Sequence, residues 1–183
     1  NKSAIDAIRT ARRRCWDYDW VIDLDIKGFF DNLDHDLVMQ FVRRYTDSRW
    51  ILLYVERWLK APSQSADGTL VDRTKGTPQG GVISPLLANI FMHEVFDSWM
   101  EKEFSTTPFE RYADDAIVHC KTEKQAWFVK SSIQERLAKF KLELNPEKTK
   151  IVYCRDGERR KNYPGEKFDF LGYTFRARQA KGK

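Results

Sequence analysis

The stretch FERYADDAIVHC, residues 109–120, places two adjacent carboxylates, Asp114 and Asp115, between two short runs typical of β-strands. Adjacent side chains in a strand point to opposite faces, so both acids reach one site only where a tight turn breaks the alternation. A hairpin with the acids at its tip meets this condition. Neighbouring carboxylates repel each other, and a divalent cation would offset that repulsion. An ordinary exposed turn explains the same pair, so both interpretations stay open at this point.

A second acidic face is expected in residues 20–26. Ile22, Leu24 and Ile26 would share one face of a buried strand, whereas Asp23 and Asp25 would share the other. Paired acids opposite a fully apolar face are a candidate for function, with a solvated edge strand as the alternative.

Length and composition favour one globular domain with a sizeable core, since 183 residues include 42% hydrophobic and 14% aromatic side chains. The net charge of +5 is compatible with a polyanionic partner, and basic residues cluster at 9–14, 155–161 and 176–183. Solvated faces produce similar clusters. Three separated cysteines, Cys15, Cys120 and Cys154, suggest buried thiols and no disulfide framework. No apolar stretch approaches the ~20 residues of a membrane span, so we expect a cytoplasmic protein without a membrane partner.

The other segments alternate between helical and extended patterns. Together they predict an α+β fold of the split β-α-β type, which is an antiparallel, ferredoxin-like sheet with helices packed on one face. Two expected helices have a predicted cap: residues 3–14 with Ser3, and residues 37–45 with Asp34 or Asp36. A third helix starts at about residue 47 and would bury Tyr54 and Trp58. A fourth would have Ser84 as its N-cap and Pro85 at N1, and the fifth spans 124–140. The expected extended segments are a hairpin at Asp67-Gly68, a strand at 151–153 and a hairpin at 168–175.

Two loops lie close in sequence to these acids and helices. Residues 27–34 would form a turn that exposes Phe29 and Phe30, and residues 75–81 form a glycine-rich loop before a helix. Such a loop can lie against a base or a phosphate, although glycines before a helix are also common punctuation. In the expected sheet, Asp25 would face the Asp114-Asp115 hairpin tip. Three carboxylates from two neighbouring strands can hold two Mg²⁺ ions about 3.5 to 4 Å apart.

Five motifs in a fixed order give the chain a family resemblance. It resembles reverse transcriptases of the group II intron maturase type, and the resemblance runs from about Ser3 to Phe175. The motifs are DIKGFFD (25–31), GTPQGGVISPLLAN (76–89), YADD (112–115), LNPEKTK (144–150) and FLGYTF (170–175).

The resemblance implies a polymerase palm that binds two Mg²⁺ ions, with Mn²⁺ as an alternative. Asp25 and Asp114 would be direct metal ligands, Asp115 would lie beside them, and the Ile26 carbonyl would complete the site. Lys148 would assist the pyrophosphate leaving group, and Lys150 is its rival. The implied catalytic residues are therefore Asp25, Asp114, Asp115 and Lys148.

The resemblance also implies residues that contact the nucleotide and the primer. The nucleotide-binding set would be Phe29, Phe30, Pro78, Gln79, Gly80 and Gly81. Within it, the Phe30 ring would take the place of a steric gate that excludes a 2′-OH. Leu171, Gly172 and Tyr173 would form the primer grip. Ordinary core packing remains an alternative for Phe30, and a solvated turn for Lys148.

The implied organisation is a remnant of the fingers at 1–19, a palm at 20–167, and a primer-grip hairpin with a basic tail at 168–183. We expect the upstream fingers and the downstream thumb to be absent, and the isolated fragment to be weak or inactive. The implied function is an RNA-directed DNA polymerase acting on an RNA template, a DNA primer and dNTP, with intron RNA as a further partner of the full-length parent. The alternative is an RNA-binding maturase module without catalysis. A nucleotide cyclase is disfavoured because Phe30 and Gln79 would have no role in it.

Overall fold

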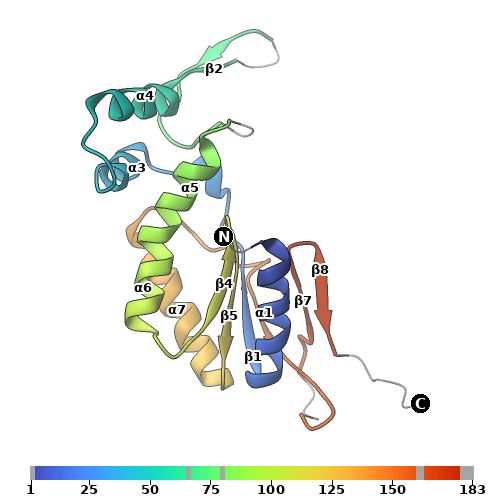
Figure 1. Cartoon of the computed structure of the whole chain (residues 1–183). Coiled ribbons are helices and arrows are strands. Elements are labelled where there is room, and N and C mark those ends of the chain that lie inside the picture. Colours follow the sequence, from blue (N-terminus) through green and yellow to red (C-terminus); the bar gives the residue numbers. More distant parts are fainter. Residues whose placement is uncertain (1–2, 65–66, 79–80, 160–162, 178–183) are drawn as a thin grey trace.

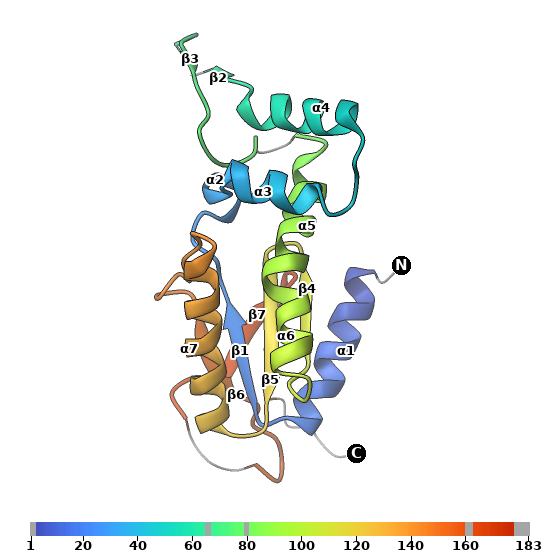
Figure 2. The same ribbon diagram turned by 90° about the vertical axis from the view of Figure 1, so that its left-hand side faces the viewer.

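The computed structural model describes residues 3–64, 67–78, 81–159 and 163–177. Its lower half is built on a four-stranded antiparallel sheet with the strand order β4-β5-β1-β6 (Figures 1 and 2). The strands are β1 (Trp20–Leu24), β4 (Phe109–Tyr112), β5 (Asp115–Cys120) and β6 (Lys150–Tyr153). The predicted α+β class and antiparallel sheet are confirmed.

Strand β1 lies inside the sheet and sets the register of its neighbours. Leu24 lies opposite Ala116 of β5, and Asp23 lies opposite Lys150 of β6. Beyond β1, an isolated bridge joins Ile26 to Leu144. Asp25, which directly follows β1, is therefore held beside the first residues of β5.

One face of the sheet is covered by two long helical segments (Figure 2). The first runs without a break through α5 (Ser84–Met92), the π-helix η1 (His93–Asp97) and α6 (Ser98–Glu103), and the second is α7 (Glu123–Lys139). Helix α7 buries the stripe that the sequence predicts, namely Ala126, Val129, Ile133 and Leu137. Each of its large apolar side chains contributes about 1.5 to 3 kcal/mol when it leaves water.

The other face carries α1 (Ala4–Asp17) and the hairpin of β7 (Lys167–Phe170) and β8 (Tyr173–Arg176). A smaller core forms there, in which Ala11 of α1 and Phe170 of β7 meet Val21 of β1. Ser3 begins α1 with a reciprocal capping box to Asp6, as predicted. Helices on one face are thus confirmed for α5 to α7, whereas α1 covers the opposite face.

The upper part of Figure 1 contains α2 (Phe29–Asn32), α3 (His35–Val42), α4 (Arg49–Lys60) and the short hairpin of β2 (Ser63–Gln64) and β3 (Leu70–Val71). Asp34 caps α3 by accepting a hydrogen bond from the Leu37 N–H at 3.1 Å. The expected hairpin around Asp67-Gly68 is confirmed. The domain boundaries at 19/20 and 167/168 remain predictions.

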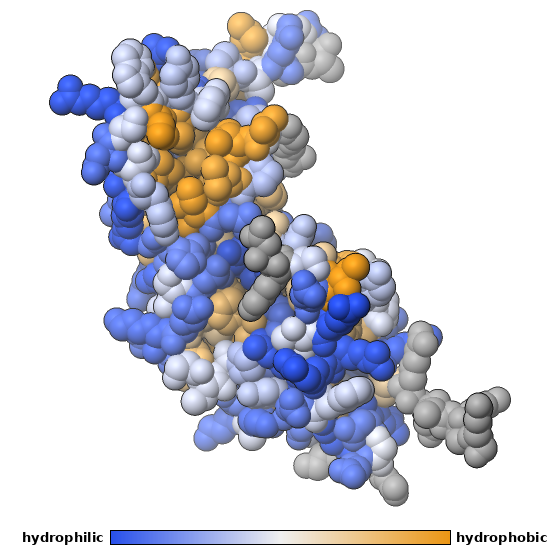
Figure 3. All heavy atoms as spheres, in the orientation of Figure 1, coloured by the Kyte–Doolittle hydropathy of each residue, from blue (hydrophilic) through white to orange (hydrophobic). Residues whose placement is uncertain are grey.

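Two sequence predictions for this upper part are wrong. Residues 29–32 form a helix instead of a plain turn, and Phe29 is only 2% exposed because its ring packs edge-on against Phe91 in the core. Tyr54 and Trp58 of α4 are 48% and 45% exposed, since α4 buries only Val55 and Leu59. Figure 3 shows other hydrophobic side chains gathered on this upper surface.

The start of α5 also differs from the prediction. Ile83 is its N-cap, and Ser84 is already helical with Pro85 in the first turn. The Ser84 hydroxyl donates to the Pro78 carbonyl at 2.8 Å, so it fastens the preceding loop instead of capping the helix. No helix in the described ranges is both long and apolar enough to cross a membrane.

Candidate active site

A cavity of about 350 Å³ opens where β1 ends and β5 begins. It contains carboxylates from the end of β1, from the β4–β5 turn, from the segment before β6 and from β7, together with one lysine before β6 and one at its first position. Its lining residues are Asp23, Leu24, Asp25, Ile26, Asp114, Asp115, Glu147, Lys148, Lys150 and Asp169. The structure thus brings together the predicted Asp25, Ile26, Asp114, Asp115 and Lys148.

The main chain around Asp25 is fixed by the segment before β6. The Asp25 carbonyl accepts a hydrogen bond from the Asn145 N–H at 2.8 Å and another from the Thr149 hydroxyl at 3.2 Å. The Asp25 N–H is 3.2 Å from the same hydroxyl oxygen. These contacts hold the carboxylate of Asp25 at the mouth of the cavity.

The two acids of the turn have different surroundings. Asp115 accepts a hydrogen bond on Oδ2 from the Leu171 N–H at 3.0 Å, which joins β5 to the β7–β8 hairpin. Within the described residues, the Asp114 carboxylate has no hydrogen bond or ion pair. Asp114 is therefore free to bind a ligand, whereas one Asp115 oxygen is already engaged.

Negative charge is incompletely neutralised in this cavity. Burial raises the pKa of Asp23 to about 7, and Asp115, Asp169 and Asp25 act in the same direction against Lys150. Burial, with Asp114 and Asp25, also raises the pKa of Asp115 despite the bond from Leu171. A bound cation would relieve this repulsion.

Lys148 forms an exposed ion pair with Asp25. Its Nζ is 3.8 Å from Asp25 Oδ1, while its side chain is 70% exposed. Asn145 shapes the turn before it, because the Asn145 side-chain oxygen accepts the main-chain N–H of Lys148 at 3.3 Å. Lys150 also borders the cavity, opposite Asp23 in the sheet. Both lysines therefore stay candidates for a contact with substrate phosphates.

The donor set suits a hard divalent cation. Carboxylate oxygens are the ligands that Mg²⁺ and Ca²⁺ prefer, and the cavity lining holds six carboxylates against two lysines. As the side chains lie, no three Asp, Glu, His or Cys groups of the described chain already surround a common ion position. Asp25 and Asp114, both half-buried, are the candidates to hold the ion.

The predicted nucleotide-binding residues that the structure describes belong to a neighbouring region, not to the cavity lining. The loop before α5 is bonded to α2, because the Thr77 N–H donates to the Phe30 carbonyl at 2.8 Å. Gly76 adopts φ +79° there, and a Cβ would lie 2.8 Å from the Asp31 carbonyl oxygen, so only glycine fits. Gln79 and Gly80 fall outside the described residues.

The remaining predicted contacts differ in exposure. Phe30 is half-buried, and Pro78 and Gly81 are joined by a main-chain hydrogen bond of 3.1 Å. Phe29 is buried as a whole residue, and its ring packs edge-on against that of Phe30 at a centroid distance of 5.3 Å. At the predicted primer grip, Leu171 and Gly172 form the β7–β8 turn with φ of 52° and 78°, and Tyr173 is 58% exposed.

Three acids that line this cavity, Asp23, Glu147 and Asp169, are missing from the site that the sequence predicts. Asp23 was placed on the acidic face of β1, yet it was not assigned to the site. Asp169 had not been considered. Its signal is the alternation in β7, where Phe168 and Phe170 are buried and Asp169 between them faces the cavity.

An antiparallel sheet with an acidic turn beside a second acidic strand end defines the class of this protein as a polymerase palm. The chain belongs to the reverse transcriptase (RNA-dependent DNA polymerase) family, whose model matches residues 1–175. The predicted resemblance to this family is confirmed.

Two relatives illustrate the family. Protein YkfC of Escherichia coli is 32% identical over 161 residues, which cover 84% of this chain and 38% of YkfC. The group II intron-encoded protein LtrA of Lactococcus lactis is 34% identical over 94 residues, or 51% of this chain and 16% of LtrA. The chain therefore spans well under half the length of these relatives.

A solved structure shares the fold. Apo telomerase from Candida tropicalis superimposes with a TM-score of 0.71 over 96% of this chain and 39% of the telomerase chain. The sequence identity is 18%, so this likeness concerns the fold alone.

Proposed function

We propose that the protein carrying this chain is an RNA-directed DNA polymerase, which adds nucleotides from dNTP to a DNA primer on an RNA template. The observation that carries the proposal is the convergence of Asp25 and Asp114 on one cavity where negative charge is in excess. Family membership supports it. A module that only binds RNA has no need for this cluster, since grouped anions repel phosphates.

In the proposed reaction, the primer 3′-hydroxyl oxygen forms a bond to the α-phosphorus of the dNTP and loses its proton to solvent, while the bond to the bridging oxygen of pyrophosphate breaks. Asp25, Asp114 and the Ile26 carbonyl would hold two divalent ions. Mg²⁺ or Mn²⁺, when bound, lowers the pKa of the attacking hydroxyl and offsets charge on the phosphates. Lys148 lies beside Asp25 and donates a proton to the leaving pyrophosphate oxygen.

Other residues orient the substrates. Phe30, Pro78, Gln79, Gly80 and Gly81 contact the incoming nucleotide, and Phe29 supports the Phe30 ring from the core. The Phe30 ring excludes a ribose 2′-OH. Leu171, Gly172 and Tyr173 position the primer end, and the Asp115 bond to the Leu171 N–H couples that hairpin to the acidic turn.

Primer extension tests this proposal. The full-length wild-type parent should extend a DNA primer on an RNA template with Mg²⁺, and Asp114→Ala in that parent should abolish extension while RNA binding remains. Asp36→Ala, which removes an exposed acid from the first turn of α3, is the matched control. Undiminished extension by Asp114→Ala would show that the metal assignment is wrong. RNA binding by the wild type without extension would favour the non-catalytic maturase alternative.

A further inference from the structure

The guanidinium of Arg111, on β4, joins three parts of the chain. It forms a bidentate ion pair with Asp97, with Nε to Oδ1 at 2.7 Å and Nη2 to Oδ2 at 2.5 Å. Its third nitrogen, Nη1, donates to the Ala113 carbonyl at 2.6 Å and to the Asn89 side-chain oxygen at 2.9 Å. We call this set of contacts, made by Arg111, Asp97, Asn89 and the Ala113 carbonyl, the Arg111 clamp.

The clamp is largely shielded from water. The side chain of Arg111 is 10% exposed and that of Asp97 is 17% exposed. Planar two-point contacts of this kind are among the stronger hydrogen bonds in proteins and they fix orientation. The clamp is therefore a rigid connection and not a loose surface pair.

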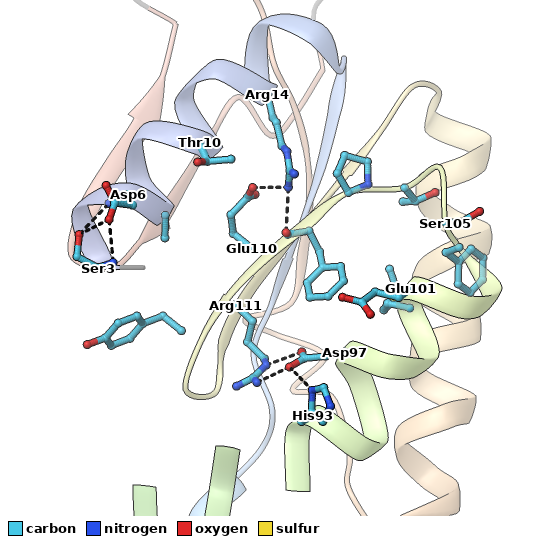
Figure 4. Close-up of a pocket in the computed structure, with 17 residues that line it drawn as sticks. Ser3, Asp6, Thr10, Arg14, His93, Asp97, Glu101, Ser105, Glu110 and Arg111 are labelled. Carbon is cyan, nitrogen blue, oxygen red and sulfur yellow. Dashed lines mark hydrogen bonds and ion pairs between the residues drawn. The ribbon is translucent and has the colours of Figure 1, made fainter. Parts of the chain in front are cut away.

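Figure 4 shows the Arg111–Asp97 pair of the clamp, which borders a pocket of about 550 Å³ between α1, the η1–α6 segment and β4. Arg111 and Asp97 border this pocket, and His93 lies 3.6 Å from Asp97. Neither Arg111 nor Asp97 lines the carboxylate cavity. The clamp therefore holds the acidic turn on a side of the sheet that does not line the carboxylate cavity.

The helical segment that supplies Asp97 is itself unusual. Asp97 is the last residue of the π-helix η1, and such insertions are frequent at functional sites. A second arginine, Arg136 of α7, donates to the η1 carbonyls of Val95 and Glu94 at 2.9 and 3.2 Å. Helix α7 and the sheet thus both hold η1, which makes it a firm support for Asp97.

Ala113, whose carbonyl accepts a hydrogen bond from Arg111, sets the direction in which the Asp114 side chain projects. Ala113 has φ +57°, a left-handed conformation that costs a non-glycine residue about 1 kcal/mol or more. Its carbonyl belongs to the peptide unit whose nitrogen is that of Asp114. A bond that fixes this carbonyl therefore also fixes the backbone from which the Asp114 carboxylate projects.

We propose that Arg111 is a positioning residue for the metal-binding carboxylate of Asp114, with Asp97 and Asn89 holding the guanidinium in place. This inference rests on the proposed function, because it assumes that Asp114 binds the catalytic ion. Loss of the clamp lets the turn adopt other conformations, so only a fraction of the molecules present Asp114 in the orientation that binds the ion. The apparent ion affinity is multiplied by that fraction. The free energy of one charge-assisted hydrogen bond corresponds to a change of about tenfold to a hundredfold in ion affinity.

The test uses variants that differ in what they leave behind. Arg111→Ala alone strands the shielded Asp97 carboxylate and risks unfolding. The double variant Arg111→Ala/Asp97→Ala removes both charges, and Arg111→Lys keeps the charge without the planar fork. Arg44→Ala is the matched control, because Arg44 also forms an ion pair with η1, through Glu94, but does not reach the turn.

Two measurements are made on each variant that keeps the wild-type circular dichroism spectrum. Mn²⁺ binding to the protein is followed by electron paramagnetic resonance, and primer extension is followed as a function of Mg²⁺ concentration. We expect the double variant and Arg111→Lys to need about tenfold or more Mg²⁺, to bind Mn²⁺ correspondingly less tightly, and to regain much of their rate at high Mg²⁺. Arg44→Ala should match the wild type, since a purely structural loss would not shift the ion requirement.

The outcomes separate this inference from the proposed function. A folded double variant with wild-type Mn²⁺ affinity and Mg²⁺ requirement would overturn the positioning role, while an inactive Asp114→Ala would leave the proposed function in place. If Asp114→Ala also kept wild-type Mn²⁺ affinity and extension, the proposed function would fail and the inference with it.

Discussion

Asp115 should stabilise the fold through its hydrogen bond to the Leu171 N–H, and substitutions at this position measure that bond. Asp115→Asn and Asp115→Ala both remove the charge, but only asparagine keeps an oxygen that can accept the bond of 3.0 Å. An N–H left without a partner in a partly buried position costs about 1 to 2 kcal/mol. We expect Asp115→Ala to be less stable than Asp115→Asn by that amount, or by about 2 to 8 °C in Tm for a chain of this length.

The sign of the charge effect follows from the raised pKa. Burial, Asp114 and Asp25 raise the pKa of Asp115, so its charged form is disfavoured in the folded state. The wild type therefore loses stability as pH rises from the ordinary aspartate pKa of 3.8 through the raised value. Asp115→Asn escapes this loss. In metal-free buffer at pH 8 it should be at least as stable as the wild type.

Urea denaturation followed by circular dichroism gives the free energies of unfolding. Asp114→Asn and Asp114→Ala form the control pair and should differ by less than about 0.5 kcal/mol, because Asp114 accepts no hydrogen bond among the described residues. Hydrogen exchange at the Leu171 amide adds a local readout, and exchange should accelerate in Asp115→Ala alone. Equal stability of the two Asp115 variants, with unchanged exchange at Leu171, would refute the reasoning.

Three further predictions concern other parts of the chain. Phe30→Ala should admit ribonucleotides in primer extension, and unchanged sugar discrimination would contradict the gate. Burial raises the pKa of Asp34, but the Lys141 ammonium and the hydrogen bonds of the α3 cap outweigh burial and lower this pKa below 3.8. Asp34→Ala should therefore lower the free energy of unfolding by about 1 to 2 kcal/mol at pH 7, and the loss should shrink below pH 4. Asp36→Ala, the control, should stay near the wild type in the same urea titrations. Burial raises the pKa of Cys120 to about 12, so iodoacetamide should label it only after unfolding, and rapid labelling of the native protein would count against a buried thiol.

The palm could be predicted because its signals are local. Alternation in residues 20–26 and the helical stripe of 124–140 each depend on neighbours a few positions away, and both appear in the structure. The meeting of Asp25 with the Asp114 turn follows from one pairing of adjacent strands. Motif order then placed these elements in a known family.

Contacts between segments far apart in the chain could not be predicted from the sequence. Nothing near Asp115 indicates that it accepts a bond from residue 171, and nothing near Arg111 indicates Asp97 and Asn89 as partners. The exposed aromatic residues of α4 show a different limit. An amphipathic pattern indicates which face is apolar, but not how much of that face other elements cover.

The most direct test of the central claim is the position of a divalent ion. Crystals of the protein soaked in Mn²⁺ would reveal the ion by its anomalous scattering. We predict a peak at about 2.1 Å from carboxylate oxygens of both Asp25 and Asp114, with Asp115 keeping its bond to the Leu171 N–H. A peak held by Asp115 and Asp169 away from Asp114, or no peak in the cavity at saturating Mn²⁺, would contradict the account.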